Sequence, residues 1–211
     1  MKGKFIVIEG IDGSGKTTQI NQLSKWINST DLIPETNQLV ITREPGGTKL
    51  GKLIRSFLLD TSNKKPPDSI TELLLYAADR AQHVNEIILP SLNKGDWVIS
   101  DRFCGSTLAY QGYGRKLDIK LIKDLENIAT QGISPDITFL LDIPVDESIK
   151  RRKCREDDRI EKEGRDFLIN VSMGFQELSE DNKWKRISAL KSEREIIFEI
   201  KSEIEKLIKN I

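Results

Sequence analysis

The 211-residue chain is poor in the residues that build disulfide frameworks and histidine-based sites. Its two cysteines, Cys104 and Cys154, form no CxxC pair, so a disulfide framework and a zinc site are disfavoured and a reducing compartment is expected. With one histidine, His83, the chain offers neither a catalytic triad nor a histidine metal site, and we interpret this residue as structural.

Charge imbalance and long apolar runs are also missing. The 33 basic and 33 acidic side chains cancel, which argues against a protein that coats nucleic acid. No apolar stretch approaches the roughly 20 residues that a membrane span needs, and the first residues show no signal-peptide pattern. The sequence therefore predicts a cytoplasmic protein whose partners include neither nucleic acid nor a membrane.

Short β-branched segments alternate with helical patterns along the chain. Segments typical of strands lie at 4–9, 39–42, 97–100, 136–143 and 185–190. Apolar residues recur at helical spacing over 20–27, 50–58, 73–92, 117–129 and 196–211, with the long pattern expected to stop near Pro90 and Gly95. This order predicts an α/β fold with a mostly parallel five-stranded sheet and helices on both faces. The tracts 61–69 and 151–166 are the ones we expect to be flexible.

The segment Gly10 to Thr17, GIDGSGKT, matches the phosphate-binding pattern G-x-x-x-x-G-K-[ST] between a strand and a helix. Glycines keep the loop free of side chains that would block its backbone N–H groups from a phosphate. Lys16 can reach the β- and γ-phosphates, and Thr17 can ligate Mg²⁺. The glycine order differs from the G-x-G-x-x-G of dinucleotide-binding folds. The sequence therefore predicts a P-loop NTPase-type three-layer fold that binds a nucleoside triphosphate.

Charged and polar side chains gather where later strands end. Arg43 ends the second strand, and Asp101 and Arg102 end the third, at the sheet edge where ligands bind. Other candidates are Tyr76 and Arg80, four residues apart on one helical face, and the polar or aromatic group Ser106, Tyr110 and Gln111. No NKxD guanine motif follows a later strand, which disfavours a GTPase. Together these residues indicate transfer of a phosphoryl group to a phosphorylated acceptor.

The motifs resemble those of the bacterial thymidylate kinase family. IEGIDGSGKTTQ, TREPGG, YAADRAQH, DRF, STLAYQG, PDITFLLDI and DRIE occur in the family's order and spacing over almost the whole chain. The resemblance implies a single nucleoside monophosphate kinase domain over 1–211 with a small lid at about 150–163. It further implies phosphorylation of dTMP to dTDP by ATP with Mg²⁺, and a homodimer.

The resemblance also implies roles for individual residues. For ATP these are Gly10, Ile11, Asp12, Gly13, Ser14, Gly15, Lys16, Thr17, Thr18, Arg151 and Ala189. Mg²⁺ would be held by Thr17 and Asp101, with Glu9 orienting a coordinated water. For dTMP, Asp12 would meet the sugar 3′-hydroxyl, Arg43 and Arg102 the phosphate, and Tyr110 the deoxyribose. Tyr76, Arg80, Ser106 and Gln111 would surround thymine.

The resemblance raises the question of which cations stabilise the transferred group. Some relatives carry an arginine directly after the P-loop aspartate, where this chain has Gly13. We therefore expect lid arginines to act with Lys16, Asp12 and Arg102. If a helix runs into the lid, Arg151 and Arg155 share one face and can reach ATP, whereas Arg152 points to solvent.

Two other functions stay open at this stage. A second P-loop nucleoside or nucleotide kinase, such as a deoxynucleoside kinase, would need a carboxylate base and no pair of arginines for an acceptor phosphate. A non-catalytic nucleotide-binding regulator would bind ATP without turnover. Lys16, Thr17, Asp101 and Arg102 together argue against a regulator.

Overall fold

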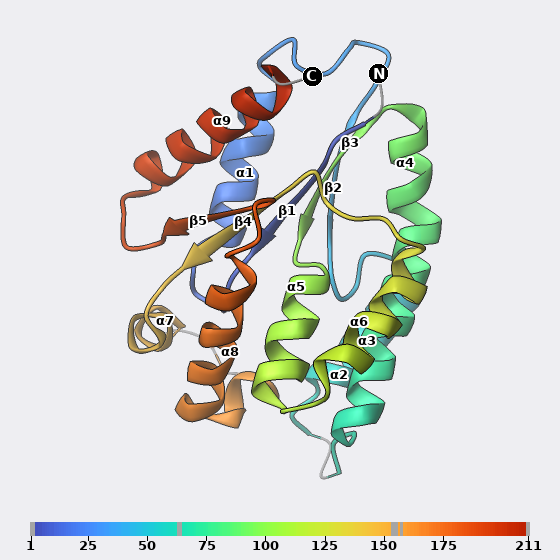
Figure 1. Cartoon of the computed structure of the whole chain (residues 1–211), viewed down its shortest axis with the longest axis vertical. Coiled ribbons are helices and arrows are strands. Elements are labelled where there is room, and N and C mark those ends of the chain that lie inside the picture. The colour runs from blue at the N-terminus through green and yellow to red at the C-terminus, as the bar shows by residue number, and fades with distance from the viewer. Residues whose placement is uncertain (1–2, 63–64, 153–155, 157, 210–211) are drawn as a thin grey trace.

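The computed structural model describes residues 3–62, 65–152, 156 and 158–209 (Figure 1). Within these ranges one parallel sheet has the strand order β2-β3-β1-β4-β5. Its strands are β1 (Phe5–Glu9), β2 (Leu39–Arg43), β3 (Trp97–Asp101), β4 (Ile137–Asp142) and β5 (Trp184–Ser188). All five strands predicted from the sequence are thereby confirmed.

Helices lie between the strands and after the last one. They are α1 (Lys16–Ile27), α2 (Lys49–Leu59), α3 (Ser69–His83), α4 (Leu89–Lys94), α5 (Cys104–Thr107), α6 (Ile119–Thr130), α7 (Val145–Arg152), α8 (Arg165–Leu178) and α9 (Glu193–Lys209). Two π-helical segments, η1 (Val84–Ile88) and η2 (Leu108–Gly114), and the 3₁₀ turn η3 (Glu161–Glu163) complete the described elements. No helix in the described part of the chain is long and apolar enough to cross a bilayer.

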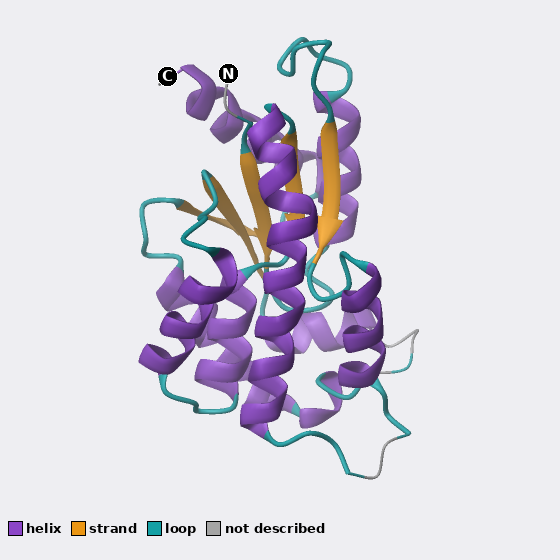
Figure 2. Ribbon diagram, turned by 90° about the vertical axis from the view of Figure 1, so that its right-hand side faces the viewer, coloured by secondary structure: helices purple, strands orange, loops and turns teal. Residues whose placement is uncertain are grey.

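The sheet separates two apolar layers, as predicted. Along β1, Ile6 and Ile8 belong to a core that includes residues of α1 and α9, whereas Phe5 and Val7 pack with residues of η1 and α4. Successive side chains of a strand point to opposite faces, so a strand covered on both sides is apolar throughout. The three-layer arrangement is visible in Figure 2, where helices flank the orange sheet.

Two helical regions differ from the sequence-based expectation. The long helix expected over 73–92 does end at Gly95, with a left-handed φ of 90°, but it contains a π-helical turn, η1, between α3 and α4 that was not expected. The π-helical turn η1 lies directly before Pro90, where the missing N–H and the ring disturb ordinary α-helical bonding. The charged tract 151–166, expected to be flexible, contains η3 and the first residues of α8.

The carboxyl ends of the strands face the helical half of the molecule (Figures 1 and 2). The P-loop follows β1, Arg43 ends β2, and Asp101 ends β3. Because β2, β3 and β1 are neighbours in the sheet, these three sites meet at one edge.

Candidate active site

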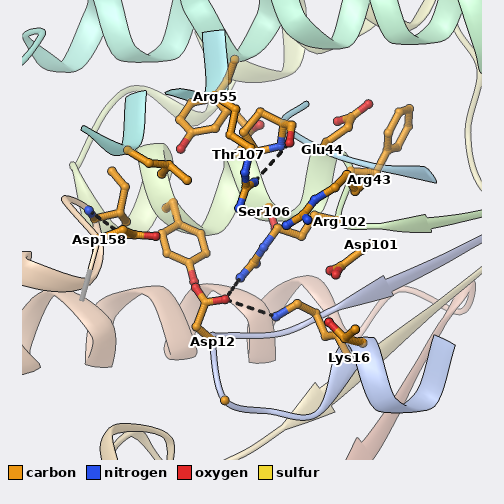
Figure 3. A pocket seen from close by; sticks show the side chains of 18 of the residues that line it. Asp12, Lys16, Arg43, Glu44, Arg55, Asp101, Arg102, Ser106, Thr107 and Asp158 are labelled. Carbon is orange, nitrogen blue, oxygen red and sulfur yellow. Dashed lines mark hydrogen bonds and ion pairs between the residues drawn. The ribbon is translucent and has the colours of Figure 1, made fainter. Parts of the chain in front are cut away.

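A cavity of about 440 Å³ lies at this edge of the sheet (Figure 3). It collects most of the predicted site residues: Asp12, Gly13, Gly15, Lys16, Thr17, Thr18, Arg43, Tyr76, Arg80, Asp101, Arg102, Ser106, Tyr110, Gln111 and Arg151. The predicted residues that do not line it are Glu9, Gly10, Ile11, Ser14 and Ala189. Arg155 lies outside the described residues.

The P-loop is shaped by glycines that no other residue could replace without strain. Gly10 and Gly13 have φ of 139° and 80°, and a Cβ on Gly10 would lie 2.6 Å from the carbonyl oxygen of Leu141. Lys16 folds across the loop, and its Nζ donates to the carbonyls of Gly10 (3.0 Å) and Ile11 (3.2 Å). Burial, followed by the nearby Arg102 guanidinium, lowers the pKa of Lys16. The P-loop is therefore a glycine-rich backbone loop with one cationic side chain, Lys16.

Arg102 connects the P-loop to the rest of the cavity. Its Nη1 donates to the Gly10 carbonyl (2.9 Å) and to Ser106 Oγ (2.9 Å), and its Nη2 donates to Asp12 Oδ1 (3.0 Å). Figure 3 shows Arg102 and Lys16 both directed at Asp12. The backbone of Arg102 is left-handed, with φ of 73°, a conformation that non-glycine residues adopt at some energetic cost.

Glu9 is directed at the segment after β3. Its carboxylate accepts hydrogen bonds from the backbone N–H groups of Phe103 (2.9 Å) and Ser106 (3.0 Å) and from Ser106 Oγ (2.6 Å). Burial raises the pKa of Glu9. In this structure Glu9 therefore holds the turn that carries Ser106 and, through it, Arg102.

Asp101 and Thr17 are suited to a divalent cation. Both line the main cavity and a neighbouring pocket of about 280 Å³. Oδ1 of Asp101 is buried and has no hydrogen-bond partner among the described residues, which is costly for a carboxylate oxygen unless a ligand satisfies it. The described residues contain no cluster of three or more histidine, cysteine or acidic side chains able to hold a metal. A cation here would take its other ligands from phosphate and water, as Mg²⁺ commonly does.

Three arginines line the same cavity: Arg43 and Arg55 lie away from the P-loop, and Arg102 lies between them and Asp12 (Figure 3). Burial, and next the nearby Arg43 guanidinium, lower the pKa of Arg55. Nη1 of Arg55 donates to the Pro45 carbonyl at 3.1 Å, and Arg43 makes no ion pair with a described residue. Sequence reasoning missed Arg55, because a single arginine within a helix carries no motif of its own. Like charges held together in a cavity favour a bound anion.

Arg80 lines the cavity but is largely committed to protein partners. Its Nε donates to Glu44 (2.7 Å), and its Nη1 donates to Thr107 (2.8 Å) and to Glu126 of α6. His83 extends this hydrogen-bond network: its Nδ1 lies 2.7 Å from Glu44 Oε1, which agrees with the structural role expected for it. Glu44 and Glu126 were not identified from the sequence, and both neutralise a buried guanidinium.

The prediction that Arg152 faces solvent is wrong. Its side chain is only 5% exposed, lines the cavity and forms a 3.1 Å ion pair with Glu161. The cause is the rotation of α7: Ser148, one turn earlier, donates its Oγ to the Asp12 carbonyl at 2.6 Å, so this face of the helix packs on the P-loop. The Arg151 side chain is 37% exposed, and its Nη2 donates to the Ala189 carbonyl at 3.1 Å.

A phosphate-binding loop after a central parallel strand, facing a cationic pocket across one cavity, defines a P-loop phosphotransferase. A sequence model described as thymidylate kinase matches residues 8–200. The chain belongs to the thymidylate kinase family.

Individual relatives match this chain over more than nine-tenths of their lengths. Thymidylate kinase of Prochlorococcus marinus (strain NATL2A) is 81% identical over 210 residues, with 100% of both chains covered. Thymidylate kinase of Synechococcus sp. (strain CC9902) is 56% identical over 192 residues, covering 91% of this chain and 92% of the relative. The crystal structure of thymidylate kinase from Ehrlichia chaffeensis superposes with a TM-score of 0.78 at 33% identity, covering 97% and 100% of the two chains.

Proposed function

We propose that this protein transfers the γ-phosphoryl group of ATP to dTMP, giving ADP and dTDP, within one kinase domain over 1–211. The observation that carries the proposal is that Arg43, Arg55 and Arg102 line one cavity together with the P-loop. A phosphoryl acceptor that is itself a phosphate requires such cations, whereas a nucleoside hydroxyl would leave them unpaired.

The donor side is assigned to ATP. The P-loop backbone and Lys16 would bind the β- and γ-phosphates, and Thr17 and Asp101 would hold Mg²⁺. When bound, Mg²⁺ supplies positive charge to the phosphate oxygens. We assign Arg151 and Ala189 to the nucleoside end of ATP. The support is that Arg151 lines the cavity and donates a hydrogen bond to the Ala189 carbonyl.

The acceptor side is assigned to dTMP. Arg43, Arg55 and Arg102 would bind its phosphate, Asp12 its 3′-hydroxyl, and Tyr110 would lie against the sugar. The base would lie among Tyr76, Ser106 and Gln111. Nη2, the third guanidinium nitrogen of Arg80, would also face it.

Because the acceptor oxygen is already anionic, the transfer needs no strong base. The residues act by aligning the two phosphates and by placing positive charge where it accumulates. Arg102 contacts the Gly10 carbonyl and Asp12 of the P-loop and lies among the acceptor arginines, so it is well placed to bridge donor and acceptor. We add Arg152 as a second cation beside the P-loop, in the lid segment at about 150–163, on the support of its burial against Gly13.

The discriminating experiment is an ADP-release assay with ATP, Mg²⁺ and a panel of dTMP, dUMP, thymidine and ribothymidine monophosphate. We expect dTMP to be strongly preferred, dUMP to be poor and thymidine to be inert. A deoxynucleoside kinase would instead phosphorylate thymidine, and a regulator would bind ATP without releasing ADP. Turnover of thymidine as fast as dTMP overturns the proposal.

A homodimer is the second part of the proposal, and it rests on an apolar face. Leu53, Phe57, Leu74, Leu121 and Ile128 are exposed on α2, α3 and α6, and α3 packs against both other helices. We expect sedimentation to show a dimer that Leu53→Asp dissociates. Phe198→Asp on α9 is the control, since Phe198 is 72% exposed away from these helices.

A cytoplasmic location stays a prediction from the sequence.

A further inference from the structure

Glu72, in the first turn of α3, is a buried carboxylate that accepts hydrogen bonds from three side chains. Gln111 Nε2 donates to its Oε1 at 2.8 Å, and Arg115 donates through Nε (3.2 Å) and Nη2 (3.1 Å). Arg159 donates through Nη2 at 2.5 Å. The donors come from η2 and the residue that follows it, and from the segment after α7, so one carboxylate joins two parts of the acceptor side. Glu72 itself does not line the cavity, and the catalytic chemistry described above leaves it without a role.

The contacts of Glu72 determine which end of the Gln111 amide faces the cavity. A carboxylate that accepts from two guanidinium groups is ionised and can only accept hydrogen bonds. The pKa of Glu72 is indeed lowered by Arg115 and Gln111, although burial acts in the opposite direction. The Gln111 NH₂ group must therefore turn to Glu72, and the amide oxygen is left on the other side. Gln111 lines the cavity, and its Oε1 accepts no hydrogen bond from a described residue.

We propose that Glu72 is a positioning residue for base selectivity: it fixes the Gln111 amide so that a hydrogen-bond acceptor faces the base. This inference rests on the proposed function. Such an acceptor matches a pyrimidine that carries a proton on N3, as thymine and uracil do. Cytosine has a lone pair on N3, so two acceptors would face each other and both would lose hydrogen bonds with water.

The same cluster contains a matched control. Glu163 forms an ion pair with Arg115 Nη2 at 2.6 Å but makes no contact with Gln111. Glu163→Gln thus removes one carboxylate charge from the cluster without freeing the amide. In Glu72→Gln, Arg115 and Arg159 remain donors and claim the carbonyl of the new amide. Its NH₂ group is then directed at Gln111, whose own amide is expected to turn and present a donor to the cavity.

The test compares kcat/KM for dTMP and 5-methyl-dCMP, which differ only at the N3 and C4 edge of the base. We expect Glu72→Gln to reduce the dTMP preference about tenfold or more, the value of one lost hydrogen-bond match. Glu163→Gln should leave the ratio within about twofold of the parent. A merely structural role for Glu72 would lower both rates together and leave the ratio unchanged, and that result overturns the inference.

Two further outcomes are separable. If the parent enzyme does not phosphorylate dTMP, the proposed function fails first; if it does and Glu72→Gln keeps full selectivity, only the role of Glu72 fails. Should Glu72→Gln not fold, Gln111→Met gives the decision, because it removes the acceptor while Glu72 keeps both arginines. Undiminished selectivity in Gln111→Met would then overturn the inference.

Discussion

The two halves of the cavity are built in different ways. The donor half is built around the P-loop, a run of consecutive residues whose own cation, Lys16, donates to carbonyls five and six positions away. The acceptor half is assembled from distant segments: Arg80 meets Glu44 across 36 positions, and Arg159 meets Glu72 across 87. The donor half can therefore be recognised in eight residues, whereas the acceptor half exists only once the chain has folded.

The halves also differ in how charge is compensated. In the acceptor half the most deeply buried arginine, Arg80, has carboxylate partners in Glu44 and Glu126. Arg43 and Arg55 have no ion pair with a described residue and lie in the cavity. An unpaired cation in a cavity is available to a ligand, while a paired one mainly shapes the wall. The carboxylates thus distinguish Arg43 and Arg55 from Arg80. Arg102 and Arg152 are intermediate cases, since each lines the cavity and also pairs with a carboxylate, Asp12 or Glu161.

The largest expected effects come from Lys16→Met and Arg43→Met, which test the division of roles between the two halves. Lys16 is placed to act on charge that develops during transfer, so its loss should lower kcat about 10³-fold and leave dTMP binding nearly unchanged. On the proposed assignment Arg43 binds the acceptor in ground and transition states alike, so Arg43→Met should mainly raise KM for dTMP. Steady-state kinetics with both substrates varied measures the split. Equal effects of the two substitutions on kcat would refute the division of roles.

A second comparison concerns Arg152 and Arg151 of α7. Arg152 is buried beside Gly13, so Arg152→Met should lower kcat about 10²-fold, within the range for one preorganised cation. Arg151→Met should cost less in kcat and appear mainly in KM for ATP, since Arg151 is more exposed. Single-turnover rates at saturating substrates provide the measurement. A larger kcat loss in Arg151→Met would restore the assignment made from helical spacing.

The smallest effect concerns pH and the carboxylates of the acceptor half. Burial, with the Glu44 carboxylate nearby, raises the pKa of Asp79 from 3.8 to about 6. The folded protein therefore favours protonated Asp79. The stability that Asp79 contributes in this form is complete below pH 4 and is lost as pH rises through 6.

Asp79→Asn removes this loss, and its amide oxygen can still accept the hydrogen bond from the Gly46 N–H. Relative to the parent, its free energy of unfolding should rise between pH 4 and 7 by up to about 3 kcal/mol. Denaturant unfolding at several pH values checks this. A difference that stays constant with pH would show that Asp79 titrates normally.

The strands and the P-loop could be predicted from the sequence because their signals are local: an apolar run covered on both faces, and a glycine pattern followed by lysine. The acceptor half was predicted only where a motif pointed to it. Arg55 has no motif, and the partners of Arg80 depend on how α6 packs. The orientation of Arg152 failed for another reason, since helical spacing tells which residues share a face but not which way that face turns. The contact between Ser148 and Asp12 decides it.

The closeness of α7 to Gly13 has an evolutionary consequence. A Cβ on Gly13 would lie 2.9 Å from the Ser148 carbonyl oxygen and 3.4 Å from Arg152 Cγ, on a backbone with φ of 80°. An arginine cannot enter the P-loop here while α7 keeps its place, so moving the proposed catalytic cation from the lid into the loop requires changes at both sites. The two positions are therefore epistatic. Adding the loop arginine first makes it collide with α7, and removing the lid arginine first leaves neither arginine in place.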